Sequence, residues 1–251
     1  MTNVTLYSRP RELGEALSLL RHAGAVVVGG GTEVNTGDNG EPITVVDLQA
    51  LGLDGIELRG PSVLHIGSTA SLQSLVEHPH VPVALRDAAR RELPSTLRSQ
   101  ATVGGTVCGR RRDSEVVAAL LLHQGVAVVL GLDEGMKIPL ADLINGRIRL
   151  DHRILTAVTI DPGGITASAR TGRTRADRPI VAVYGRRVGY GAHRVVIIGV
   201  EKGPLVVDGE AAEVREVLEA TVGFGDFRGS REYRRALAEV LTRRVLRELG
   251  R

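Results

Sequence analysis

Two short segments, each an apolar run that ends in consecutive glycines and a threonine, constrain the fold of this 251-residue chain most. The first reads VVGGGTEV at residues 27–34, and the second reads ATVGGT at residues 101–106. Because glycine lacks a Cβ, the backbone at such places can approach anionic oxygens closely and turn several N–H groups toward them. A diphosphate site needs this geometry, although a single Gly-Gly pair is more often simply a turn.

Neither segment matches the common glycine motifs for nucleotides. No Gly-Lys-Ser/Thr follows either one, so the P-loop of phosphoryl-transferring enzymes is excluded. The Rossmann pattern G-x-G-x-x-G also fails, because Val34 stands where the third glycine would follow Gly29 and Gly31. The sequence also lacks G-x-S-x-G, H-E-x-x-H and C-x-x-C, which argues against serine hydrolases, zinc proteases and thioredoxin-like proteins.

Composition predicts a soluble, cytoplasmic protein. The chain is 43% hydrophobic and 24% charged, and no apolar run approaches the roughly 20 residues that span a bilayer. No secretory signal is visible in the first 20 residues. The single cysteine, Cys108, cannot form an internal disulfide or hold an iron–sulfur cluster or zinc alone. Arginines beside it could make this thiol reactive, but a buried small residue is the commoner fate.

The positive charge does not indicate a nucleic-acid partner. Residues 228–251 carry eight arginines and three glutamates, whereas the whole chain has a net charge of +3. Most of these arginines fit the solvated face of a helix, and only four Tyr and two Phe are present to stack on bases. The apolar stripe of that helix is expected from Tyr233, Leu237, Val240, Leu241 and Val245.

Hydrophobic periodicity predicts an α+β chain of two blocks. The boundary is the D-P-G-G sequence at residues 161–164, which supports neither a helix nor a central strand. The helices are expected over 11–22, 70–77, 82–92, 115–123, 210–219 and 230–249. The strands are expected over 25–28, 43–48, 56–58, 63–66, 126–130, 154–160, 165–170, 180–187 and 195–200.

In combination and order, these motifs resemble one family, the flavoprotein (medium) subunits of the molybdenum hydroxylases, such as xanthine dehydrogenase and carbon monoxide dehydrogenase. Residues 29–34, GGGTEV, match the end of a segment similar to A-G-G-x-S/T-D/E-L. Residues 97–106, LRSQATVGGT, resemble I/V-R-N-x-A/G-T-I/V-G-G-N, and residues 64–69, LHIGST, resemble L-x-I-G-A-x-T. GSREYRR at 229–235 resembles the family's C-terminal helix. The resemblance covers nearly the whole chain.

The resemblance implies an FAD-binding domain of the PCMH or vanillyl-alcohol-oxidase type, with two α+β subdomains, over residues 1–161. A small C-terminal α+β domain of the CO dehydrogenase flavoprotein type, with a three-stranded sheet and helices, would follow over 162–251. It also implies a large molybdopterin-binding subunit and a small 2Fe-2S subunit as partners. Electrons would pass from the clusters through FAD to NAD⁺, a quinone or O₂. The implied FAD-binding residues are Val27, Val28, Gly29, Gly30, Gly31, Thr32, Glu33, Val34, Thr102, Val103, Gly104, Gly105, Thr106, Glu115 and Arg170.

Some of these positions leave alternatives open. Glu115 replaces the family's usual aspartate. Its carboxylate either reaches the cofactor or only caps the N-terminus of the following helix, where a negative charge is favourable. The family usually has a basic residue, often lysine, near the start of the strands of its C-terminal domain, and Arg170 lies close to that position. Tyr184 and Tyr190 either approach the flavin or, as we favour, pack on a sheet.

The main departure from the family is the run RRR at 110–112, which replaces small, acidic and proline positions. These arginines could pair with phosphate, lie at a subunit contact, or mean that FAD is bound differently or not at all. The alternative function is therefore a cofactor-free assembly or scaffold subunit descended from this family. A self-sufficient flavin oxidase is disfavoured because no cluster resembling a substrate base is recognisable.

Overall fold

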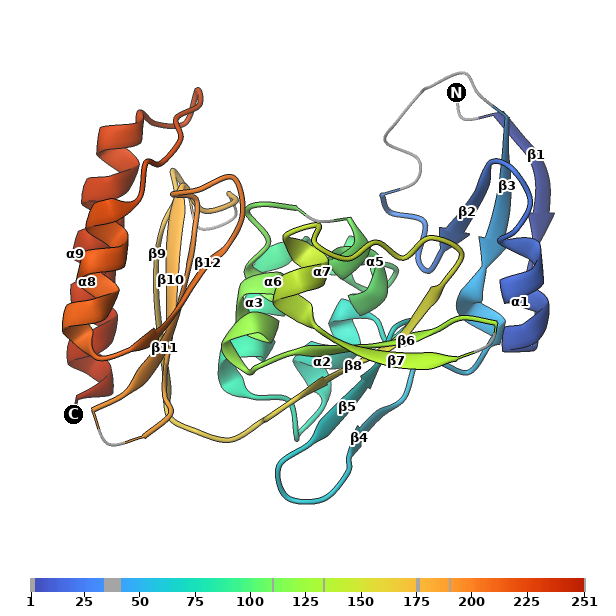
Figure 1. The fold of residues 1–251 in the computed structure, drawn as a ribbon, viewed down its shortest axis with the longest axis horizontal. Helices are drawn as coiled ribbons and strands as arrows, with labels where there is room; N and C mark the ends of the chain where they lie inside the picture. Colours follow the sequence, from blue (N-terminus) through green and yellow to red (C-terminus); the bar gives the residue numbers. More distant parts are fainter. Residues whose placement is uncertain are drawn as a thin grey trace.

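The chain folds into three α+β units that lie in a row, each with its own sheet (Figure 1). The computed structural model describes residues 3–33, 42–109, 111–132, 134–174, 177–189 and 191–250. No helix within these ranges is long and apolar enough to cross a membrane.

The N-terminal unit is a three-stranded parallel sheet with one helix. The strands lie in the order β1 (Asn3–Ser8), β3 (Pro42–Asp47) and β2 (Ala25–Val28), and α1 (Leu13–Leu19) connects β1 to β2. Strand β1 was not expected from the sequence. Its Val4 and Leu6 side chains are both exposed at the sheet edge, so the strand lacks the usual alternation of buried and exposed residues.

The middle unit is a five-stranded antiparallel sheet whose helices extend toward the C-terminal unit (Figure 1). Its strand order is β4 (Ile56–Leu58), β5 (Leu64–Gly67), β8 (Ile154–Ile160), β6 (Val126–Leu130) and β7 (Gly135–Pro139). Its helices are α2 (Leu72–Glu77), α3 (Val83–Glu92), α4 (Ser95–Arg98), α5 (Val103–Cys108), α6 (Glu115–Leu122) and α7 (Leu140–Ile144). Every residue of α6 is buried, as its unbroken apolar run predicts.

The C-terminal unit has a four-stranded antiparallel sheet, so the expected three-stranded sheet is wrong in this detail. Its order is β12 (Leu205–Gly209), β11 (His193–Ile198), β10 (Val181–Arg187) and β9 (Thr166–Thr171). The additional strand, β12, was missed because its apolar run is only three residues long and follows a Gly-Pro turn. Helices α8 (Ala211–Ala220) and α9 (Arg231–Leu249) cover one face, while α6 and α3 lie toward the other (Figure 1).

The apolar stripe expected on α9 is only partly correct. Leu241 and Val245 are buried, but Tyr233 and Val240 are 47% and 53% exposed. The buried face instead includes Arg234, whose hydrogen-bonding groups have partners inside the protein. A hydrophobicity pattern cannot predict that an arginine is buried. The face of α9 that was predicted to be buried therefore differs from the face that the structure buries.

The middle and C-terminal units share one hydrophobic core. Ala182 and Tyr184 of β10, with Val196 and Ile198 of β11, pack into the cluster built around α6. The N-terminal unit has a smaller cluster of its own, which α1, Val46 and Leu48 form with Ile154. The middle and C-terminal units are thus held together by apolar packing, and the N-terminal unit forms a separate lobe.

His123 links the end of α6 to the connection between the middle and C-terminal units. Its side chain is fully buried, and Nδ1 donates a hydrogen bond to the Asp161 carbonyl oxygen at 2.8 Å. Because the acceptor is a carbonyl, the neutral imidazole carries its proton on Nδ1. Burial lowers the pKa of His123 from 6.5 to about 4.

We expect this histidine to make the chain less stable in acid. Between about pH 6.5 and about pH 4 the unfolded chain gains a proton that the folded chain excludes, which removes about 3 kcal/mol of stability. In the variant His123→Asn, the amide can keep the hydrogen bond to Asp161 but does not titrate. Urea unfolding at several pH values should therefore show a smaller acid loss for the variant, and equal losses would contradict this role.

Candidate functional site

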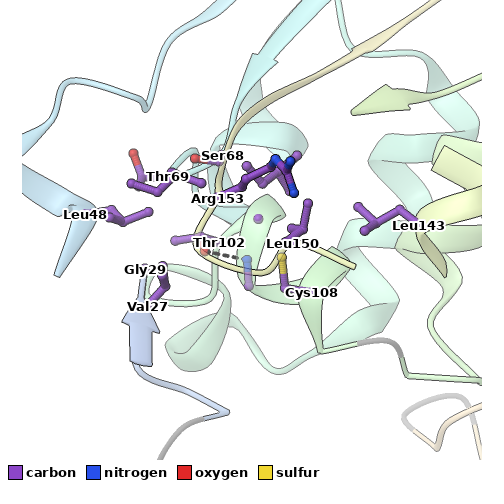
Figure 2. A pocket seen from close by; sticks show the side chains of 14 residues that line it. Val27, Gly29, Leu48, Ser68, Thr69, Thr102, Cys108, Leu143, Leu150 and Arg153 are labelled. Atoms are coloured by element: carbon purple, nitrogen blue, oxygen red, sulfur yellow. Dashed lines mark hydrogen bonds between the residues drawn. The ribbon is translucent and has the colours of Figure 1, made fainter. Parts of the chain in front are cut away.

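A cavity of about 290 Å³ lies where the N-terminal unit meets the middle unit (Figure 2). This volume is at the lower end of the range for small-molecule sites, about 300–1,000 Å³. Most of its lining is apolar, with polar groups on one side from the ends of β2 and β5 and from α5. The lining residues are Val27, Gly29, Leu48, Ser68, Thr69, Thr102, Gly104, Gly105, Cys108, Leu143, Leu150, Arg153, Ile154 and Leu155.

The structure brings the two glycine segments into direct contact. A Cβ placed on Gly30 would lie 1.7 Å from the carbonyl oxygen of Gln100, and one on Gly29 would lie 2.6 Å from Thr102 Oγ1. Gly31 has a φ of +72°, which side-chain-bearing residues rarely adopt. The glycines of the first segment are therefore required for its backbone to pack against the start of the second segment.

The second segment is the start of helix α5 rather than a loop. Thr102 Oγ1 accepts a hydrogen bond from the Gly105 N–H at 3.1 Å, drawn as a dashed line in Figure 2. The N–H of Gly104 donates to the Ser68 carbonyl at 2.7 Å, and a Cβ on Gly104 would lie 2.8 Å from that oxygen. These two glycine N–H groups are thus used within the protein, and Gly104 serves close packing.

The first segment retains backbone donors. The N–H groups of Gly30, Gly31 and Thr32 have no acceptor among the residues that the structure describes. Ser68 adds a hydroxyl at the cavity wall that is 3% exposed and has no partner within the described part of the chain. Buried polar groups are rarely left without a hydrogen bond, so this hydroxyl fits a site that takes a polar ligand.

Five of the predicted residues line the cavity: Val27, Gly29, Thr102, Gly104 and Gly105. Seven others that the structure describes belong to the same segments without lining it. Val103 is buried in the main core, and the Thr106 hydroxyl donates to the Thr102 carbonyl at 2.9 Å. Val34 lies outside the described residues. The described members of the first segment that do not line the cavity are Val28, Gly30, Gly31, Thr32 and Glu33.

Glu33 contacts the arginine run instead of the cavity. Its carboxylate forms an ion pair with Arg111, at 3.2 Å between Oε1 and Nη1. Arg110 lies outside the described residues, and Arg112 is exposed. Arg111 and Arg112 also line a second, more open cavity of about 650 Å³ that reaches Lys202 and Phe224 of the C-terminal unit. Arg111 and Arg112, the described part of the departure from the family pattern, thus lie outside the lining of the first cavity.

Glu115 and Arg170 lie together, but in a buried cluster outside the cavity lining. Glu115 Oε1 lies 3.0 Å from Arg170 Nε, and Glu115 Oε2 lies 3.3 Å from Arg91 Nε. The Tyr184 hydroxyl donates to Glu115 at 2.5 Å. Their contact with a cofactor therefore stays a prediction, and their present partners join the middle unit to the C-terminal sheet.

Tyr184 packs within the sheet, as we favoured, while Tyr190 lies outside the described residues. Burial raises the pKa of Tyr184 well above 10, and the Glu115 carboxylate raises it further. The N-terminal N–H groups of helix α6 donate to side chains other than Glu115. Ser114 Oγ accepts from Val117 N–H and Glu92 accepts from Val116 N–H, both at 3.1 Å. The Glu115 carboxylate takes no part in these two hydrogen bonds, and its contacts with Arg170 and Tyr184 join the middle unit to the C-terminal unit.

The variant Tyr184→Phe tests this cluster. We expect it to cost about 1–3 kcal/mol, because a hydrogen bond to a buried charged group is lost while the ring still fills its place. Urea unfolding measures the loss. A variant as stable as the wild-type chain would show that this hydrogen bond contributes nothing.

Asp113 makes a second link between the middle and C-terminal units. Its two carboxylate oxygens accept from Arg178 and Arg228, each at 3.1 Å. Arg178 also lies 3.6 Å from Glu92, whose pKa is raised by burial. These ion pairs lie at the same boundary as the Glu115 cluster, so polar and apolar contacts together fix the C-terminal unit in place.

Sequence reasoning missed most of the remaining lining. Ser68 and Thr69 fall in the L-x-I-G-A-x-T resemblance, which could have suggested them. Cys108 is exposed at the cavity, so its expected fate as a buried residue is wrong, because α5 ends at the cavity wall. Arg153 belongs to the run RILTAV at residues 153–158, which resembles the family's pattern but does not mark the arginine as a binding residue. The apolar positions that were missed are Leu48, Leu143, Leu150, Ile154 and Leu155.

Comparison with known proteins agrees with this architecture. A quinoline 2-oxidoreductase from Pseudomonas putida 86 superposes with a TM-score of 0.87 at 18% identity, over 97% of this chain and 96% of that chain. A carbon monoxide dehydrogenase from Hydrogenophaga pseudoflava, which lacks the Mo-pyranopterin moiety of its molybdenum cofactor, superposes with a TM-score of 0.85. That match has 19% identity and covers 98% of this chain and 97% of that chain. At these identities the matches show the fold.

Sequence comparison adds the family. Uncharacterized protein YgfM of Escherichia coli K12 is 28% identical over 247 residues, which cover 94% of this chain and 92% of the relative. The family model described as the FAD binding domain in molybdopterin dehydrogenase matches residues 2–161. This chain therefore belongs to the family of FAD-binding domains of molybdopterin dehydrogenases.

Proposed function

We propose that this chain is the FAD-binding subunit of a molybdenum-containing hydroxylase or dehydrogenase. The observation that carries the proposal is the cavity at the junction of the two glycine segments, in a chain of this family. The Ser68 hydroxyl, which has no partner among the described residues, fits a polar ligand, and the close packing at Gly29 and Gly30 holds the two glycine segments together beside the cavity. Bound FAD would supply the capacity to take up electrons and release them to NAD⁺, a quinone or O₂.

The chain's own residues would bind and orient the cofactor. Ser68 and Thr69 offer hydroxyls at the cavity wall, and Gly30, Gly31 and Thr32, which follow the lining residue Gly29 in the chain, offer backbone N–H groups. The apolar side of the cavity, which includes Leu143, Leu150 and Ile154, would exclude water from the uncharged part of the ligand.

The electron source would be another chain. The sequence has one cysteine, so it cannot supply the thiolates of a 2Fe-2S cluster. We propose a small 2Fe-2S subunit and a large molybdopterin-binding subunit as partners. Support comes from the family's own description and from the fold shared with proteins named as carbon monoxide dehydrogenase and quinoline 2-oxidoreductase.

The test is the metal and flavin content of the complex that contains this chain. After purification under native conditions, we expect molybdenum, iron and FAD, with about one FAD per copy of this chain. A complex with molybdenum and iron but no flavin would favour the cofactor-free assembly subunit. A chain that purifies with neither metal would contradict the proposed partners.

A further inference from the structure

We infer that Arg153 binds the anionic part of the cofactor and makes this cavity selective for a flavin that carries a diphosphate. The inference rests on the proposed function and goes beyond it, because it assigns the selectivity to one side chain. Arg153 is not among the FAD-binding residues that the family resemblance implies.

Arg153 lies in the segment that leads into β8, next to the cavity. Its backbone N–H donates to the Leu150 carbonyl at 2.9 Å, which fixes the turn before the strand. The stem of its side chain runs past Gly131, where a Cβ would lie 3.6 Å from both Cγ and Nε. The side chain is half-buried and lies among the lining residues, as Figure 2 shows by its blue nitrogen atoms.

Arg153 is the only charged residue among the described residues that line this cavity. Within the described part of the chain, no carboxylate lies in the lining to balance it. Ser68, the buried hydroxyl without a partner, and Thr69 line the same cavity. The polar groups of the wall are thus one guanidinium and several hydroxyls, a combination that suits an anionic ligand.

Arg153 also differs from the other arginines of the chain. Every other buried or half-buried arginine in the described ranges has a carboxylate, amide or carbonyl partner for its guanidinium, whereas Arg153 has none. A partly desolvated cation without a partner is unfavourable unless a ligand supplies the opposite charge. The planar guanidinium matches phosphate oxygens well, because it can donate two parallel hydrogen bonds.

The experiment compares flavins that differ in charge. FAD carries a diphosphate, FMN a monophosphate and riboflavin no phosphate, and each is titrated into the flavin-free chain by equilibrium dialysis. We expect Arg153→Gln to weaken FAD binding about 10- to 100-fold and to leave riboflavin binding unchanged. Added salt should weaken FAD binding less in Arg153→Gln than in the wild-type chain.

Two further variants separate charge from folding. Arg153→Lys keeps the positive charge and should retain most of the affinity that Arg153→Gln loses. Arg149→Gln removes a nearby arginine whose side chain is 77% exposed, and it should bind FAD as the wild-type chain does. Thermal unfolding of each variant shows whether a change in binding follows from a loss of structure.

The outcomes separate this inference from the proposed function. Equal losses for FAD and riboflavin, or an unchanged FAD affinity in Arg153→Gln, would overturn the role of Arg153 while leaving the flavin site in place. If neither the wild-type chain nor its native complex binds flavin, the proposed function fails, and inorganic pyrophosphate then becomes the probe. Pyrophosphate binding that Arg153→Gln abolishes would still support the anion site, and its absence from the wild-type chain would overturn it.

Discussion

Replacing Gly30 with alanine is expected to abolish FAD binding and to destabilise the chain by about 3 kcal/mol or more. The added methyl group would lie 1.7 Å from the carbonyl oxygen of Gln100, which belongs to the backbone and cannot move as a flexible side chain does. The two glycine segments would have to separate, and the cavity between the N-terminal and middle units would lose its shape. Urea unfolding and FAD titration measure the two effects.

Gly14→Ala is the matched control. Gly14 lies in the first turn of α1, and a Cβ there would meet no atom within 4 Å. We expect this variant to gain about 0.5–1 kcal/mol, because alanine favours the helix, and to bind FAD as the wild-type chain does. If Gly30→Ala were as stable as Gly14→Ala and bound FAD equally well, the packing of the two segments would not be required.

The second large effect is expected at Arg234, a fully buried residue of helix α9. Its Nη1 donates to the carbonyls of Ile180 and Gly199 at 2.7 and 2.8 Å, and its Nη2 donates to Asp226. The guanidinium also lies 4.7 Å from the centre of the Phe224 ring. This single side chain therefore joins the last helix to β10, to the end of β11 and to the loop before α9.

Arg234→Met should cost about 3–5 kcal/mol, because it leaves a carboxylate and several carbonyl groups without their cation. Arg235→Met is the neighbouring control. Arg235 is 41% exposed and lies 3.6 Å from Glu239, so its loss should cost less than about 1 kcal/mol. Equal unfolding free energies for the two variants would show that Arg234 does not hold the C-terminal unit together.

The sequence predicted those elements whose pattern is local. Strands β2, β6 and β8 have the predicted bounds because each is an unbroken apolar or β-branched run. Helix α6 was recognised as buried because its residues are apolar on all sides. The edge strand β1 and the short strand β12 were missed, since their partners in the sheet, rather than their own pattern, determine them.

The two glycine motifs marked only part of the cavity lining. Gly29 and Gly104 were selected from their glycine motifs, and the structure adds that a Cβ on either one would clash with its neighbours. Helix α5 was read as a loop because two glycines in the first turn of a helix contradict local propensity. Arg153 was not selected from the sequence, because only the folded chain shows that its side chain lines the cavity.

The most direct test of the flavin site is the titration of FAD into the flavin-free chain, carried out alone and within its native complex. We predict saturable binding of one FAD per chain, lost in Gly30→Ala and retained in Gly14→Ala. Absence of binding in both the isolated chain and the complex would contradict the flavin site and leave the cofactor-free assembly subunit as the better description.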